Sequence, residues 1–185
     1  MAATVTLTGS QFDALPYEDG RRWELLDGEL IPVSSPTPER QLILQRILLA
    51  LMIHLRANPG QGLALTDVEF ALDENYRVRP DVLVLLHDRA HSLDMKKIPV
   101  PGAPDLAIEI ISPSERSSDT QEKLQAYLRY GTREVWQVYP KSRSVVVYRG
   151  GESSTLADGE LSTPLLEGFS WRFGRFSNRR LTFAR

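Results

Sequence analysis

Apolar residues recur at helical spacing through residues 39–57, the longest stretch of this kind in the chain. Ile43, Ile47 and Leu51 fall three to four residues apart and share one helix face. Further leucines fill the neighbouring positions, so we expect this helix to be buried around much of its circumference. Asn58-Pro59-Gly60 is a stop signal and predicts its end.

Two continuous aliphatic runs, at residues 82–86 and 106–111, predict strands of a different kind. Such runs are typical of strands that are covered on both faces. The first run is the end of a longer strand-like segment, 78–86, which Arg79-Pro80-Asp81 interrupts near its start. Another strand-like segment precedes it at 63–72, with a turn at 73–75 between the two.

Shorter elements complete the pattern. Asp27-Gly28 separates two apolar runs and is a strong hairpin signal. Ser118 and Gln121 form a capping-box pattern before a helix that ends at Gly131. The remaining predicted elements are a helix at 8–15, a surface loop at 87–104, strands at 134–139 and 144–148, and short β segments after 150. Because helices and strands mix without strict alternation, we predict an α/β fold with a mixed sheet.

Composition narrows the class of protein without naming a partner. The 185 residues include 42% hydrophobic and 25% charged side chains, as in ordinary globular domains. The absence of cysteine excludes thiolate nucleophiles and zinc–thiolate sites. The net charge of -2 indicates no partner. Because the N-terminus lacks a secretory pattern and no apolar run could span a bilayer, we expect a cytoplasmic protein without a membrane partner.

Three acidic residues stand in apolar surroundings. Asp81 opens one aliphatic run and Glu109 lies inside another, while Glu24 is flanked by Trp23 and Leu25. Burial disfavours the charged form of an unpaired carboxylate. Each of these acids therefore needs a cation nearby, which is a lysine, an arginine or a divalent metal.

Asp81 and Glu109 allow two interpretations. For either acid alone, a separate salt bridge at a strand end is the better one. Together, on neighbouring strands, they could bind one hard cation such as Mg²⁺ or Mn²⁺, with the backbone carbonyl of Ile110 as a further ligand. Two acids on buried strands, followed by a helix that carries a lysine, favour this second interpretation.

Lys123 is the candidate cationic partner of these acids. It shares one helix face with Tyr127 and Tyr130, at spacings of four and three residues. The alternative is an exposed ion pair with Asp119, four residues earlier, and the helix taken alone favours that weaker pair.

The order of these residues resembles the PD-(D/E)xK nuclease superfamily, in which a Pro-Asp pair, a second acid and a lysine follow one another. More closely, the sequence resembles the bacterial Uma-type endonuclease family, which is restriction-endonuclease-like. The matching segments are 23–30 (WELLDGEL), 79–82 (RPDV), 109–114 (EIISPS), 119–123 with Tyr127, and 131–136. Each segment is weak alone, but the ordered set is fairly specific and extends from about residue 12 to about residue 173.

The resemblance implies one restriction-endonuclease-like domain over residues 1–185, with a mixed β-sheet flanked by α-helices. Its core would span about 12–173 and be followed by a basic, aromatic C-terminal tail. The resemblance also implies that Asp81 and Glu109 bind the metal and that Glu24 completes or tunes the site.

Three positions depart from the usual pattern, and one of them is Tyr139, where relatives often carry an acid before the proline. The superfamily lysine normally follows the second acid by two residues, where this chain has Ile111. The family is thought to place it on the next helix, where Lys123 lies. Many relatives also carry a histidine near the start of the long helix, around the positions of Arg40 and Gln41 here.

We therefore expect a metal-dependent endonuclease that hydrolyses phosphodiester bonds of DNA, with Mg²⁺ or Mn²⁺ as cofactor. If so, Arg77 and Arg79 are candidate phosphate contacts and Tyr127 is a further candidate nucleic-acid contact. Two alternatives stay open: a nuclease fold that no longer cuts and binds nucleic acid or a protein, and a structural module that only assembles. By analogy with nucleases of this fold, we expect a homodimer.

Overall fold

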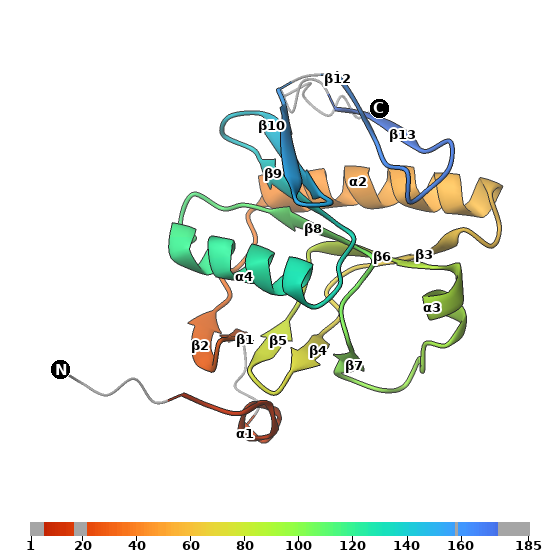
Figure 1. The fold of residues 1–185 in the computed structure, drawn as a ribbon. Helices are drawn as coiled ribbons and strands as arrows, with labels where there is room; N and C mark the ends of the chain where they lie inside the picture. Colours follow the sequence, from red (N-terminus) through yellow and green to blue (C-terminus); the bar gives the residue numbers. More distant parts are fainter. Residues whose placement is uncertain (1–5, 17–21, 158, 174–185) are drawn as a thin grey trace, which may run out of the picture.

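Helices and strands alternate irregularly along residues 6–16, 22–157 and 159–173, which the computed structural model describes (Figure 1). The helices are α1 (Gly9–Asp13), α2 (Pro38–Ala57), α3 (His87–His91) and α4 (Ser117–Arg129). The strands are β1 (Trp23–Leu26), β2 (Glu29–Pro32), β3 (Gly62–Leu65), β4 (Phe70–Asp73), β5 (Tyr76–Val78), β6 (Val82–Leu86), β7 (Val100–Pro101), β8 (Leu106–Ile110), β9 (Glu134–Tyr139), β10 (Ser144–Arg149), β11 (Glu152–Leu156), β12 (Gly159–Ser162) and β13 (Ser170–Phe173). This mixture confirms the α/β class.

The largest sheet has the strand order β11-β10-β9-β8-β6-β3. β8 and β9 run parallel and the other neighbours are antiparallel, so the sheet is mixed, as predicted. Helix α2 packs on one face, where Ile108 belongs to the same core cluster as Ile43 (Figure 1). On the opposite face, Ala107 clusters with Leu124 of α4. Successive residues of β8 therefore point to opposite helices, which places Glu109 on the α4 side.

A second sheet, with the order β2-β1-β5-β4-β7, packs on the same side as α4. The predicted strands 63–72 and 78–86 were wrong as single elements, because each is divided between the two sheets. The first breaks around Asp67, which has a positive φ of 56°. The second breaks at Pro80, which has no N–H for a sheet ladder. The segment 79–81 thus carries the chain from one sheet to the other.

The hairpin predicted at Asp27-Gly28 is confirmed. Both residues have positive φ, 49° and 78°. This is the geometry of the tight turn that matches the twist of the paired strands. The capping box predicted at Ser118 is wrong, because α4 begins one residue earlier, at Ser117. Its N-cap, Arg116, makes no side-chain capping hydrogen bond.

Helix α2 is less buried than its sequence predicted. Its fully buried side chains are Ile43, Ile47 and Leu51. Its exposed apolar side chains are Leu42, Leu49, Met52 and Ile53, of which Ile53 is 62% exposed. The reason is geometric: the sheet covers one face of this helix, while the leucine-rich sequence carries apolar residues around most of it.

The C-terminal part adds a two-stranded sheet, β12-β13, and Leu161 of this sheet joins the α2 side of the core. The predicted basic, aromatic tail falls mostly on residues 174–185, which lie outside the described residues. In the described part of the chain, no helix combines the length and apolar character needed to cross a membrane.

Candidate functional site

Backbone pairing brings Asp81 and Glu109 to one place. β6 and β8 are antiparallel with Val82 opposite Ile108, so continuing this register by one residue sets Asp81 opposite Glu109. The N–H of Ile110 donates to Asp81 Oδ2 at 2.7 Å. The carboxylate thus accepts the hydrogen bond from β8 at the point where the chain leaves the ladder.

Glu24 joins these acids from the other sheet. It lies on β1, which pairs with β5. Its Oε1 accepts a hydrogen bond of 2.6 Å from the N–H of Arg79, in the segment that links the two sheets. Glu24 is only 6% exposed and Glu109 only 7%, so both carboxylates are withdrawn from water.

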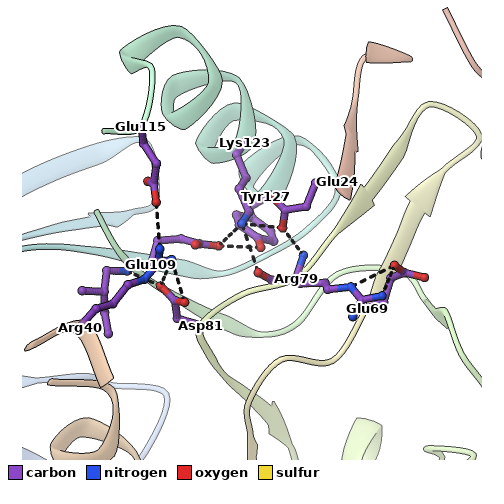
Figure 2. A network of polar contacts seen from close by, with 10 residues as sticks. Glu24, Arg40, Glu69, Arg79, Asp81, Glu109, Glu115, Lys123 and Tyr127 are labelled. Carbon is purple, nitrogen blue, oxygen red and sulfur yellow. Dashed lines mark hydrogen bonds and ion pairs between the residues drawn. The ribbon is translucent and has the colours of Figure 1, made fainter. Parts of the chain in front are cut away.

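Lys123 lies between two of the acids. From α4 its Nζ reaches 2.8 Å from Glu24 Oε1 and 3.0 Å from Glu109 Oε1 (Figure 2). It also donates to the carbonyl oxygen of Arg79 at 3.2 Å. An ammonium group has three N–H donors, and these contacts match that number. The alternative of an exposed pair with Asp119 is wrong, because Lys123 is largely buried beside Glu24 and Glu109.

The burial of Tyr127 and Arg77 changes their interpretation. The Tyr127 hydroxyl donates to Glu109 Oε1 at 2.9 Å, and its ring is fully buried. Arg77 is 5% exposed, and its Nε and Nη2 each donate to Asp13 at 2.9 Å. Since neither side chain reaches the surface, their predicted contact with nucleic acid finds no support. Arg79 is one-third exposed and pairs with Glu69, with 2.8 Å between Nη2 and Oε2.

The partner of Asp81 is Arg40, which the sequence did not reveal as a site residue. Its Nη2 lies 2.9 Å from both Oδ1 and Oδ2 of Asp81. Its Nη1 donates to Glu115 Oε1 at 3.1 Å, so Glu115 belongs to the same network (Figure 2). The one signal in the sequence was the departure at Arg40 itself, where many relatives carry histidine.

Comparison with known proteins identifies a family for this chain. The family described as "Putative restriction endonuclease", Uma2, matches residues 10–174 of the chain. The chain belongs to the Uma2 family. The crystal structure of "a putative nuclease belonging to DUF820" from Anabaena variabilis has a similar fold, with a TM-score of 0.77 and 20% sequence identity over 90% of this chain and 95% of that chain. No curated protein matches the sequence.

Family and fold agree with the sequence-based expectation. The Uma2 match supports a nuclease and hence a nucleic-acid substrate. The structural similarity confirms the predicted architecture, mixed sheets flanked by helices.

Burial and neighbouring charges together shift the pKa of Glu109 in this Uma2 chain. Burial raises the pKa of Glu109 to about 8; Lys123 opposes this shift, while the charges of Asp81 and Glu24 add to it. Burial lowers the pKa of Lys123, but Glu109 and Glu24 outweigh it, so the net shift is upward. Lys123 therefore stays charged, and Glu109 holds a proton near neutral pH.

This shift predicts how stability depends on pH. The folded protein keeps the Glu109 proton up to about pH 8, whereas the unfolded chain releases it near its ordinary pKa of 4.5. Its contribution is complete below pH 4.5 and is lost as the pH rises to 8. Relative to Glu109→Gln, we expect the wild-type unfolding free energy to fall by about 1.4 kcal/mol per pH unit between pH 5 and 8.

Urea denaturation at pH 5, 6.5 and 8 measures this difference. The exposed Glu160 offers a matched control, Glu160→Gln, which should follow the wild-type curve at every pH. Wild-type and Glu109→Gln curves that stay parallel over this range would show that Glu109 titrates normally.

A groove of about 1180 Å³ opens beside the site. Its lining includes Glu24, Arg40, Asp81, Glu109 and Lys123. The acids can therefore meet a ligand from this side, although each is now paired with a cation. The β1–β2 hairpin and the starts of α2 and α4 also line the groove. Its walls therefore come from both sheets and from two helices.

The chemistry of these residues fits a magnesium-type cation. Mg²⁺ takes oxygen ligands and commonly uses one or two carboxylates together with water and phosphate oxygens. Asp81 and Glu109 supply two carboxylates, which is a number that such a site commonly uses. Within the described residues, no group of three or more acid or histidine side chains is arranged to hold a metal. The N–H and C=O of a strand residue point to the same side, so the Ile110 carbonyl also faces the Asp81 side.

Proposed function

We propose that this Uma2 protein is a metal-dependent endonuclease that hydrolyses phosphodiester bonds of DNA. The observation that carries the proposal is the meeting of Glu24, Asp81 and Glu109 with the buried Lys123 at one groove. Strongly perturbed ionisable groups in a groove are typical of functional sites. The family match adds the class of reaction.

In this proposal Asp81 and Glu109 would hold Mg²⁺ or Mn²⁺, with the Ile110 carbonyl as a further ligand. Such a cation polarises a bound phosphate and lowers the pKa of its bound water. Glu109 must release its proton to serve as a ligand, and metal binding requires deprotonated ligands in general. We therefore expect metal affinity to rise with pH up to about 8, where the pKa of Glu109 lies.

Lys123 and its neighbours position the acids. All three Lys123 donors have partners, so Lys123 holds Glu24 and Glu109 in place while the site is at rest. The buried Tyr127 hydroxyl donates to the same Glu109 oxygen, Oε1, that Lys123 contacts. If Glu109 held a metal, the Lys123 N–H that now contacts Glu109 would be available to stabilise negative charge on the scissile phosphate. Arg79, at the rim, remains the candidate phosphate contact.

One observation favours the alternative of a nuclease fold that binds nucleic acid without cutting it. The three acids already have cationic partners, Arg40 for Asp81 and Lys123 for Glu24 and Glu109. A site that stays neutralised in this way would bind without catalysis. A cleavage assay separates the endonuclease from the binding protein, because only an active site cuts the nucleic acid that it binds.

Cleavage of supercoiled plasmid and of labelled DNA and RNA duplexes tests the proposal. We expect nicked or linear DNA in the presence of Mg²⁺ or Mn²⁺ and intact DNA in EDTA. Asp81→Asn protein, purified in parallel, shows whether any cutting comes from a contaminating nuclease. Fluorescence anisotropy on the same duplexes completes the test: tight binding without cleavage in either metal would support the binding alternative, and neither binding nor cleavage would contradict both.

A further inference from the structure

Arg40 occupies the position on Asp81 where a bound cation would lie. Arginine and carboxylate groups usually pair through two parallel N–H···O bonds from two nitrogens. Here one nitrogen, Nη2, lies 2.9 Å from both Oδ1 and Oδ2 (Figure 2). A single positive centre between two carboxylate oxygens is how a bidentate carboxylate holds a metal ion.

Arg40 is incompletely held in this position. Its Nε is buried and has no hydrogen-bond partner in the described residues. A buried donor without a partner costs free energy, so the resting arrangement is not the best that this side chain can make. Arg40 contacts two acids, and the second, Glu115, has a side chain that is 30% exposed and lines the groove.

The electrostatics of the site require a cation on Asp81. The carboxylate is 16% exposed and lies beside Glu109, whose own partner Lys123 is shared with Glu24. Without Arg40, Asp81 would have the Ile110 N–H but no positive partner among these groups. Either Arg40 or a metal ion can neutralise the Asp81 carboxylate. Both cannot bind it at once without repulsion between the two positive charges.

We propose that Arg40 is an internal competitor of the metal: it neutralises Asp81 in the resting protein and must move off Asp81, while keeping Glu115, before a divalent cation binds. This inference rests on the proposed metal site at Asp81 and Glu109. Metal occupancy of the site then depends on how well the cation competes with the Arg40 guanidinium for the two carboxylate oxygens of Asp81.

Mn²⁺ binding, followed by electron paramagnetic resonance and calorimetry without DNA, tests the proposal. We expect Arg40→Gln to bind Mn²⁺ at least about 10-fold more tightly than the wild type at pH 8, since one competing charge is gone. Arg46→Gln is the matched control: it removes the same charge from an exposed position of the same helix and should leave the affinity unchanged. Adding Asp81→Asn to Arg40→Gln should abolish the gain.

The outcomes separate this proposal from the proposed function. If the wild type and Arg40→Gln bind Mn²⁺ equally, or the variant binds more weakly, the competition is wrong and the metal site stands. If neither binds Mn²⁺, both proposals are wrong. If Arg40→Gln fails to fold, Arg40→Met replaces it: methionine also removes the competing charge and keeps an unbranched apolar stem, so its Mn²⁺ affinity should be several-fold above wild type, and an affinity at or below wild type contradicts the competition.

Discussion

Replacing Asp81 with asparagine is expected to reduce metal-dependent cleavage by about 10³-fold. The change removes a ligand charge while keeping an oxygen that can accept the N–H of Ile110, which Asp81 now binds at 2.7 Å. In such reactions a metal ion lowers the free energy of the charged transition state by several kcal/mol. Losing about 4 kcal/mol of this stabilisation slows the reaction by about three orders of magnitude. Initial rates on supercoiled plasmid with Mn²⁺ give the measurement.

Asp88→Asn is the matched control for this experiment. Asp88 follows the same strand, β6, at its opposite end, and its side chain is exposed on α3. Asp88→Asn removes the same charge at a position away from the groove, and this variant should cleave at the wild-type rate. Circular dichroism shows that both variants are folded. If Asp81→Asn keeps more than about a tenth of the wild-type rate, the reaction takes place elsewhere in the chain.

Replacing Lys123 with methionine is expected to lower the unfolding free energy by about 3–5 kcal/mol, because removal of one partner from a buried ion pair leaves unpaired charge in the interior. Glu24 and Glu109 would both lose their cation, and the Arg79 carbonyl would lose a donor. Urea denaturation at pH 7 measures the change. Methionine preserves the length and apolar stem of the side chain, so the effect reports the ammonium group.

A second substitution shows whether the ion pair is the cause. Glu24→Gln in the Lys123→Met background removes the carboxylate that is left unpaired at pH 7, where Glu109 holds its proton, and part of the lost stability should return, with a coupling energy of about 0.5–3 kcal/mol. Lys141→Met, at an exposed turn, should change stability by less than about 0.5 kcal/mol. A loss below about 1 kcal/mol for Lys123→Met would contradict the buried ion pair.

The neighbourhood of the acids was predictable because it follows from sheet geometry. Asp81 opens one hydrophobic run and Glu109 lies inside another, and such runs are central strands that tend to be neighbours. Lys123 was predictable as their partner once the helix after Glu109 was recognised, although helix spacing alone favoured Asp119. That preference failed because spacing along one helix says nothing of what packs against it.

Arg40 could not be predicted, because its role depends on where the start of α2 lies against the sheet. A one-dimensional pattern gives the period of a helix and not its docking angle. The same limit explains the exposed face of α2, where residues such as Leu49 and Ile53 face outward at 59% and 62% exposure. The burial of Arg77 was hidden for a related reason, since its partner Asp13 comes from a distant part of the chain.

The division of the site between two sheets has a consequence for the newly made protein. Glu24 comes from the sheet of β1, Glu109 from the sheet of β8, and Lys123 from α4, which follows β8 in the chain. A nascent chain that has emerged only as far as β8 has both acids and lacks the lysine that holds them together. If the protein cuts DNA through this site, the complete site forms only after both sheets and α4 have docked.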